Sequence, residues 1–306
     1  MTVLEAIQRS TEFLAKKGVD SPRLQTELLL AHLLKLPRMR LYLNFERALE
    51  PAELDAFREL IRRRGQREPL QYIVGTTSFC GLEIAVNPHV LIPRPETELL
   101  AERGWQFLNQ LSAPNGSASA SGCGATAPKG SEGGQPATAL DVGTGSGCLA
   151  IALATKCLGA QVHAVELSAE ALEFARQNAE RHAVAERIQF LQGDWFAALP
   201  AGSSFDLILS NPPYIATPEL ETLQPEVRQH EPRRALDGGA DGLEYVRRLA
   251  AEAGRFLKPG GRLMLEFGDG QADAMRGLFQ REKWIVEAVQ PDYTQRPRIG
   301  VMKREQ

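Results

Sequence analysis

The sequence predicts an α/β protein whose mostly parallel sheet carries helices on both faces and follows a small helical bundle. From Thr138 onward, short apolar runs alternate with stretches of helical periodicity, which is typical of parallel sheets with helical crossovers. The first 68 residues instead place leucine and isoleucine at helical spacing. A glycine-rich turn joins the first apolar run to the first helical stretch, where such sheets bind ligands.

The N-terminal segment, residues 1–68, is expected to form a helical domain of its own. Ser21 and Pro22 indicate a helix start, with serine as the cap and proline at the first helical position. Pro51 begins a further helix, and Gly65 ends it. This segment contains no cluster of side chains suited to catalysis.

Residues 69–111 differ in character and are expected to connect the two domains. Residues 71–75 and 82–86 have the composition of two short strands, which could form a hairpin. Residues 91–95 are expected to be extended, because each proline disfavours helix in the residue before it. Residues 96–108 have the pattern of a helix.

Residues 112–137 are rich in glycine, alanine, serine and proline, and are expected to form a flexible surface insertion. Residues 138–306 are expected to form the α/β domain. Its predicted strands are residues 139–142, 162–165, 188–191, 205–210, 262–267 and 285–289, and its predicted helices are residues 148–156, 169–182, 242–256 and 271–279.

Composition excludes several classes of protein. A net charge of −3 gives no basic footprint, so stable nucleic-acid binding is not expected. The five histidines and four cysteines show neither a metal-ligand spacing nor a C-x-x-C pair, so we predict no metal site and a reducing compartment. The N-terminus lacks a signal-type apolar run, and no segment is apolar enough to span a membrane. We therefore expect a cytoplasmic protein.

The glycine-rich turn predicts a nucleoside-containing ligand. It consists of Gly143, Thr144, Gly145, Ser146 and Gly147, and glycines allow the backbone to turn tightly and to approach a ligand closely. Glu166 ends the next predicted strand, where an acid can bind ribose hydroxyls. A turn of this kind can also connect strand and helix without binding anything.

The pattern argues against a nicotinamide dinucleotide. That fingerprint requires glycine at position 148, which is cysteine, and a pyrophosphate disfavours a nearby acid such as Asp141. S-adenosylmethionine contains no phosphate, and its ammonium and sulfonium groups are cationic. An acid close to the loop therefore favours S-adenosylmethionine as the cofactor.

The segment Asn211-Pro212-Pro213-Tyr214 follows the predicted strand at 205–210, at the edge where such sheets bind ligands. The prolines fix the backbone and leave carbonyl groups as acceptors, and the Asn211 side chain adds another acceptor. Two acceptors can hold the two hydrogens of a planar NH2 group and direct its lone pair at a methyl group. The methylated nitrogen is acidic, so no strong base is needed. The segment therefore predicts methylation of an amide or an aromatic amine.

Asp194 and Trp195 follow the predicted strand at 188–191 and suit an adenine ring. The acid can accept a hydrogen bond from the amino group, and the indole can pack on the ring. A core tryptophan beside a capping aspartate is the alternative interpretation.

With these motifs in place, the chain resembles the peptide chain release factor N(5)-glutamine methyltransferase (PrmC/HemK) family over nearly its full length. The matching segments are residues 69–75, 91–98, 141–147, 193–196, 211–214, 231–232, 235–236, 238–243, 265–268 and Gln271. The resemblance implies a Rossmann-like S-adenosylmethionine-dependent methyltransferase domain behind a helical bundle that docks the substrate. It implies a monomer that methylates the glutamine of the Gly-Gly-Gln motif in class-1 release factors.

The resemblance also implies roles for individual residues. Residues 143–147, Glu166, Trp195 and Asn211 would bind the cofactor, and residues 211–214 would cradle the glutamine amide. Arg94 and Glu96 would line the pocket, although a structural ion pair of Arg94 is an equal alternative.

The chain departs from the family in two places. The insertion at 112–137 is longer than the usual connection and makes the domain boundaries uncertain. Near the C-terminus the family has D-x-x-G-x-x-R, whereas Gln295 stands at the glycine position here. That substitution puts the local turn in doubt.

Three other functions were weighed. A ribosomal-protein glutamine methyltransferase is the nearest, but the Arg-Pro-Glu-Thr-Glu sequence at 94–98 favours the release-factor branch. A DNA adenine methyltransferase would share the motif at 211–214 but would need a basic DNA-binding face. A non-catalytic docking module would have a damaged cofactor loop, and this loop is intact.

Overall fold

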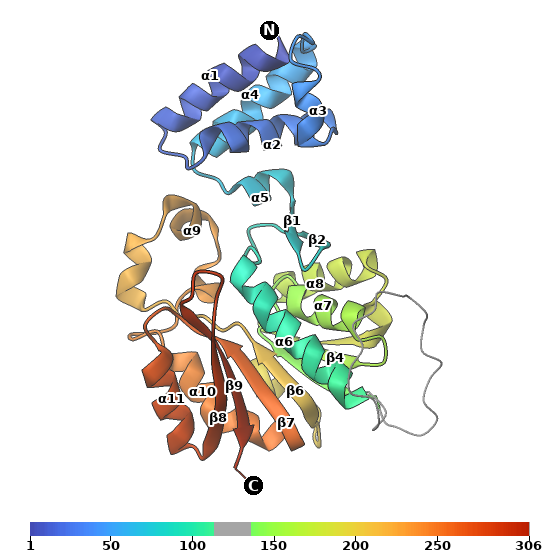
Figure 1. The fold of residues 1–306 in the computed structure, drawn as a ribbon, viewed down its shortest axis with the longest axis vertical. Coiled ribbons are helices and arrows are strands. Elements are labelled where there is room, and N and C mark those ends of the chain that lie inside the picture. Colours follow the sequence, from blue (N-terminus) through green and yellow to red (C-terminus); the bar gives the residue numbers. More distant parts are fainter. Residues whose placement is uncertain (113–135, 306) are drawn as a thin grey trace. The chain divides into compact units, whose positions relative to one another are not determined.

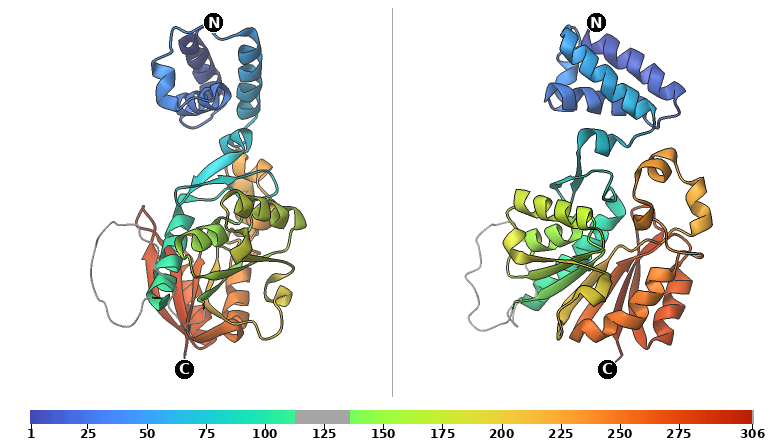
Figure 2. Two further views of the ribbon diagram at one scale, coloured as in Figure 1. Left: turned by 90° about the vertical axis from the view of Figure 1, so that its right-hand side faces the viewer. Right: turned by 180° about the vertical axis from the view of Figure 1, so that it is seen from behind.

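The computed structural model of the protein describes residues 1–112 and 136–305, and its fold is drawn in Figures 1 and 2. Nearly all of the insertion expected at 112–137 lies outside the described residues. The chain divides into two compact units. We call them the helical unit, Met1–Thr77 with Ala85–Ile92 and Glu221–Arg233, and the sheet unit, Ser78–Ile84 with Pro93–Leu220 and Arg234–Gln306.

The helical unit contains six short helices, and the first five pack around one apolar core, whereas α9 buries no residue. The helices are α1 (Val3–Lys16), α2 (Pro22–Leu34), α3 (Arg38–Tyr42), α4 (Pro51–Gly65), α5 (Leu70–Val74) and α9 (Pro225–His230). Leu14, Leu29 and Phe57 are almost fully buried in that core. Pro22 begins α2 as predicted, but the expected serine cap is wrong. Ser21 has a φ of 47°, and its side chain makes no capping hydrogen bond.

The strand predicted at 71–75 is also wrong, because those residues form helix α5 instead. Leu70, Ile73 and Val74 stand at helical spacing and all pack against the core of the helical unit. Gly75 ends the helix with a φ of 86°. Core packing thus overrides the strand preference of two β-branched residues. The hairpin lies slightly later, between β1 (Thr76–Phe79) and β2 (Leu82–Ala85).

The sheet unit has seven strands in the order β5-β4-β3-β6-β7-β9-β8. The strands are β3 (Thr138–Val142), β4 (Gln161–Glu166), β5 (Ile188–Gln192), β6 (Phe205–Ser210), β7 (Leu257–Glu266), β8 (Trp284–Pro291) and β9 (Pro297–Arg304). The first five in spatial order are parallel, and β9 is antiparallel to both of its neighbours. The predicted α/β class is confirmed, and β9 is the one strand of this sheet that the sequence analysis did not identify.

Helices cover both faces of the sheet, as Figures 1 and 2 show. Helices α6 (Pro95–Ser112), α7 (Cys148–Lys156) and α8 (Ala169–Arg181) pack on one face, and α10 (Glu244–Glu252) and α11 (Ala272–Arg281) pack on the other. Successive side chains of a strand point to opposite faces, so Ala139 joins the first core and Leu140 the second.

The turn between β8 and β9 is closed by hydrogen bonds although Gln295 stands at the family's glycine position. Gln295 adopts a φ of 68°, which glycine would adopt without strain. The Asp292 carboxylate accepts hydrogen bonds from the backbone and the hydroxyl of Thr294 at 2.8 and 2.7 Å and from the Arg296 backbone at 3.1 Å. These bonds hold the turn and lower the Asp292 pKa to about 2. The doubt about this turn is thereby resolved.

Candidate active site

The candidate site is built where the direction of strand addition reverses. From β3 the chain adds β4 and β5 on one side and then returns to place β6 on the other. The last residues of β3 and β6, Val142 and Ser210, lie side by side, and the Ser210 hydroxyl donates to the Val142 carbonyl at 2.9 Å. The next residues, Gly143 and Asn211, therefore begin at neighbouring points of the same sheet edge, where such folds bind ligands.

The glycine loop owes its path to backbone conformations that other residues rarely adopt. Gly143, Gly145 and Gly147 have φ values of 75°, 56° and 83°. A Cβ atom at Gly147 would lie 3.1 Å from the Cβ of Ala175, so helix α8 also requires a glycine there. The Asn178 amide, from the same helix, donates to the Ser146 carbonyl at 2.9 Å. The loop is therefore rigid before any ligand binds.

Glu166 lies against this loop, as the sequence predicts. One carboxylate oxygen accepts from the Gly145 backbone N–H at 3.0 Å, and the other accepts from the Ser168 N–H at 3.0 Å. Each oxygen keeps a further lone pair. The half-buried carboxylate can thus accept additional bonds from hydroxyl groups of a ligand.

Asp141 is fully buried beneath the loop. Its Oδ2 accepts from the Thr144 hydroxyl at 2.6 Å and from the Ala150 N–H at 3.2 Å, which ties the loop to the start of α7. Its Oδ1 has no hydrogen-bond partner within the described residues. Burial raises the pKa of this carboxyl to about 7, although its two hydrogen bonds oppose that rise. Its expected proximity to a cationic cofactor stays a prediction.

Trp195 stands beside the same site but is itself packed in the core. The backbone N–H of Gly193 donates to the Glu166 carbonyl at 2.9 Å, which places the start of this segment next to Glu166. The Trp195 ring stacks on Tyr245 with centroids 5.1 Å apart, and the Arg248 guanidinium lies 5.1 Å from its centroid. Asp194 binds the same guanidinium at 2.6 and 3.0 Å. The Trp195 ring and the Asp194 carboxylate are therefore both held in place by Arg248.

Four side chains from three separate segments form a hydrogen-bonded network at the Asn211 motif. The Asn211 amide nitrogen donates to the Thr97 hydroxyl at 3.0 Å, and that hydroxyl donates to the Glu266 carboxylate at 2.7 Å. The Tyr214 hydroxyl donates to the other Glu266 oxygen at 3.2 Å. Thr97 and Glu266 are almost fully buried. We call these four residues the relay.

Burial determines the direction of the pKa shifts within the relay. Burial raises the pKa of Glu266 to about 7, while the hydroxyls of Thr97 and Tyr214 and the charge of Arg298 act in the opposite direction. Burial and the charge of Glu266 raise the pKa of Tyr214, so its hydroxyl remains a donor. The positive charge of Arg94 acts in the opposite direction and lowers the pKa of Tyr214.

The backbone that follows the motif is clamped by two later loops. The Gln271 side-chain amide donates to the Tyr214 carbonyl at 2.9 Å, and the Gly238 N–H donates to the Ile215 carbonyl at 2.8 Å. A Cβ atom at Gly242 would lie 2.4 Å from the Tyr214 carbonyl oxygen, so only glycine fits. The loops at 236–242 and 267–271 thus fix the position of Tyr214.

The structure brings the glycine loop, Glu166 and the Asn211–Tyr214 motif to one sheet edge. It adds three residues that the sequence analysis did not assign to the site. Thr97, Glu266 and Gln271 belong to segments that carried the family resemblance, but no local pattern indicated a role for them at the site. Their neighbours in space are distant in sequence. An acidic residue at the end of an otherwise apolar strand, such as Glu266, was the one available signal.

Within residues 1–112 and 136–305, no three histidine, cysteine, aspartate or glutamate side chains lie close enough to hold a metal ion. Over the same ranges, no helix has the length and apolar character needed to cross a bilayer.

Comparison with known proteins defines the class. Residues 135–294 match the family described as a methyltransferase domain, and residues 5–75 match the PrmC N-terminal domain. Among solved structures, the hMettl16 catalytic domain in complex with the MAT2A 3'UTR hairpin 6 has a TM-score of 0.51 at 14% identity. That similarity covers 80% of this chain and 82% of the other, and it shows a shared fold. The protein is a methyltransferase with an appended helical unit.

Curated relatives define the family more narrowly. The release factor glutamine methyltransferase of Geobacter sulfurreducens is 46% identical over 280 residues, covering 92% of this chain and 89% of that protein. The protein of the same name from Chlorobaculum tepidum is 43% identical over 295 residues, covering 95% and 94%. This chain belongs to the release factor glutamine methyltransferase family.

The buried Asp141 predicts a pH dependence of stability. Its pKa in the folded state is about 7, well above its ordinary value of 3.8, so between these values the folded protein keeps a proton that the unfolded chain releases. The contribution of Asp141 to the free energy of unfolding must therefore fall as pH rises. From pH 5 to pH 7, the free energy of unfolding of Asp141→Asn should rise relative to that of the unmodified protein, by on the order of 1 kcal/mol per pH unit. Urea denaturation at pH 5, 6 and 7 measures the difference.

Asp273→Asn, on the exposed surface of α11, is the matched control for the loss of a carboxylate. Parallel stability curves for Asp141→Asn and the unmodified protein would contradict the assignment of a protonated Asp141.

Proposed function

We propose that the chain transfers a methyl group from S-adenosylmethionine to the side-chain amide nitrogen of the glutamine in the Gly-Gly-Gln motif of class-1 release factors, which would support translation termination. The observation that carries this proposal is the position of Asn211-Pro212-Pro213-Tyr214, directly beside the glycine loop at the same sheet edge. Both relatives compared above are named for release factor glutamine methylation, which supports the substrate class.

The residues around the glycine loop fit this cofactor. S-adenosylmethionine supplies an electrophilic methyl group on a cationic sulfur. Residues 143–147 offer a close backbone approach, and the Glu166 carboxylate offers lone pairs for ribose hydroxyls. Trp195 provides an aromatic wall held by Tyr245 and Arg248.

The motif residues fit the amide. The Asn211 carbonyl oxygen and the Pro212 carbonyl can each accept one hydrogen of a glutamine NH2 group, and the Tyr214 ring can lie against the amide plane. With the cofactor held by the glycine loop, this arrangement would direct the nitrogen lone pair toward the methyl group that the cofactor supplies. After transfer the nitrogen is acidic and loses a proton without a strong base. Arg94 and Glu96, at the start of α6, would line the approach to the amide.

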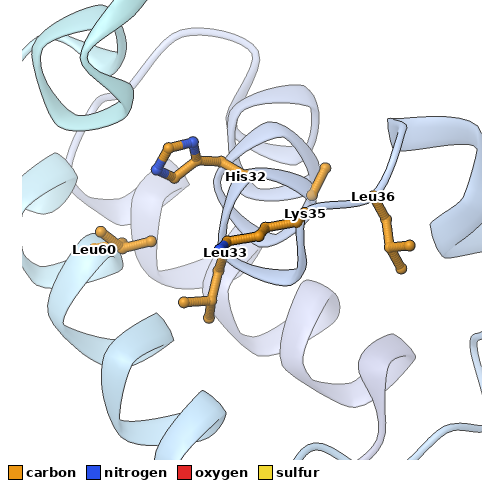
Figure 3. Close-up of a pocket in the computed structure, with 6 residues that line it drawn as sticks. His32, Leu33, Lys35, Leu36 and Leu60 are labelled. Atoms are coloured by element: carbon orange, nitrogen blue, oxygen red, sulfur yellow. The ribbon is translucent and has the colours of Figure 1, made fainter.

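We further propose that the helical unit docks the release factor. Its surface exposes Leu24 on α2, Met39 on α3 and Leu43, the residue after α3. It also contains a shallow pocket of about 570 Å³, shown in Figure 3, which is lined by Ala31, His32, Leu33, Lys35, Leu36 and Leu60. Apolar side chains rimmed by polar ones are typical of protein-binding surfaces.

A labelling experiment tests the substrate. The protein is incubated with methyl-labelled S-adenosylmethionine and, separately, with a class-1 release factor, the same factor with its Gly-Gly-Gln glutamine replaced by alanine, a ribosomal fraction without release factors, and duplex DNA. Label should enter the unmodified release factor and be absent from the other three. Label in the ribosomal fraction or the DNA, with none in the release factor, would overturn the proposal.

Asn211→Ala tests the site. The variant removes the carbonyl acceptor that would orient the amide, so the rate of methyl transfer should fall by at least about 100-fold. The melting temperature should change little, because Asn211 is only partly buried. Asn109→Ala, on the exposed surface of α6, is the matched control and should keep full activity. Full activity of Asn211→Ala would refute the assignment.

Leu43→Asp tests docking by the helical unit. Leu43 is 75% exposed, and a carboxylate there should raise the KM for the release factor about tenfold, which corresponds to 1.4 kcal/mol. The kcat and the affinity for the cofactor should not change. Leu158→Asp, at a position that is 67% exposed in the sheet unit, should leave the KM unaltered. An unchanged KM for Leu43→Asp would exclude this surface.

A further inference from the structure

The relay determines which atom of the Asn211 amide is available at the site. An asparagine side chain can present its carbonyl oxygen or its NH2 group in either direction, and the two arrangements occupy almost the same space. Only the arrangement with the carbonyl oxygen toward the substrate can accept a hydrogen from a glutamine amide. A flipped Asn211 side chain would place its own NH2 group opposite the NH2 group of the glutamine, and neither group could accept a hydrogen bond from the other.

The direction of the hydrogen bonds follows from Glu266. An ionised carboxylate has no proton to donate, so it must accept from both hydroxyls that reach it. The Thr97 hydroxyl has one hydrogen, which it gives to Glu266 at 2.7 Å. The Thr97 oxygen can then only accept, and its partner at 3.0 Å is the Asn211 nitrogen. The carbonyl oxygen of Asn211 is thereby left for the substrate.

We propose that Thr97 and Glu266 are positioning residues for methyl transfer, which act by fixing the Asn211 amide with its carbonyl oxygen toward the target NH2 group. This inference rests on the proposed function and concerns residues that do not themselves contact the substrate. The Tyr214 hydroxyl donates to the second oxygen of the same carboxylate at 3.2 Å. Glu266 therefore orients both ends of the Asn211–Tyr214 motif through two donors.

Protonation of Glu266 would remove this control. A carboxylic acid that donates to the Thr97 oxygen frees the threonine hydrogen to bond the Asn211 carbonyl, which permits the flipped amide. The groups that set this equilibrium are Thr97 and Glu96 on α6, Tyr214 after β6, and Arg298 on β9. Arg298 favours the ionised form, whereas Glu96 and burial oppose it. With a pKa raised to about 7, the proton would bind within an accessible pH range.

A pair of substitutions at Thr97 tests the direction of the hydrogen bonds. Thr97→Val keeps the shape of the side chain but removes the hydroxyl, whereas Thr97→Ser keeps the hydroxyl. We expect Thr97→Val to lower kcat about 10- to 100-fold, because a misoriented acceptor loses most of its effect. The KM for the release factor and the dissociation constant for S-adenosylmethionine should change less than threefold. Thr97→Ser should retain at least half of the kcat.

Glu266→Gln gives an independent test that does not change the volume of the side chain. The glutamine can donate from its NH2 group as well as accept, so it no longer forces the Thr97 hydroxyl to point toward it. We expect a kcat loss similar to that of Thr97→Val. In the unmodified protein kcat should rise with pH through the Glu266 titration, and this rise should be absent from Glu266→Gln.

The outcomes separate this inference from the function on which it rests. Glutamine labelling by the unmodified protein together with a normal kcat in Thr97→Val, or a loss confined to KM or to cofactor affinity, overturns the relay alone. A pH profile of Glu266→Gln identical to that of the unmodified protein also overturns it. Failure of the unmodified protein to label glutamine overturns the proposed function and the relay with it.

Discussion

The site depends on one constraint, the parallel pairing of β3 with β6. These strands are more than 60 residues apart in the sequence, yet their last residues, Val142 and Ser210, are neighbours and share a side-chain to backbone hydrogen bond. Because a parallel pair ends at a common edge, the glycine loop and the Asn211 motif begin within one strand spacing of each other. The last residues of β4 and β7 then add Glu166 and Glu266 around this junction, and the segment after β5 adds Trp195.

Two buried carboxyl groups support the junction, and neither is explained by stability. Asp141 and Glu266 are almost fully buried, and burial raises the pKa of both toward neutrality. Removing a carboxylate from water is costly, and an apolar pair of the same shape is often more stable. The two carboxyl groups instead fix the orientation of the groups that donate hydrogen bonds to them. Asp141 accepts hydrogen bonds from the glycine loop and from α7, and Glu266 accepts them from α6 and from Tyr214. Each carboxyl group thereby fixes a backbone or side-chain orientation that an apolar residue would leave free.

The sequence could predict those parts of the site that are local in the chain. The glycine loop, Glu166 and the motif at 211–214 were identifiable because each is contiguous and follows an apolar strand. Thr97 and Glu266 were not, because their hydrogen bonds join residues 114 and 169 positions apart, and no local pattern encodes such a contact. Helix α5 was missed for a related reason, since core packing of Leu70, Ile73 and Val74 decided its conformation. Ser21 has the residue type of a cap, but its φ of 47° excludes that role.

The segments proposed to dock the substrate and the segments that carry the site alternate along the chain. The helical unit includes Ala85–Ile92, which leads into Arg94 and Thr97, and Glu221–Arg233, which separates Tyr214 from its clamp at Gly238. Within that unit, the buried Arg64 and its neighbour Arg67 both bind Glu226 at 2.6 Å and thereby hold the later segment in place. Ala85–Ile92 precedes Thr97 in the sequence and Glu221–Arg233 follows Tyr214, whereas Glu266 lies within a later segment of the sheet unit. The unit proposed to dock the substrate is therefore interleaved along the chain with the segments that carry the relay.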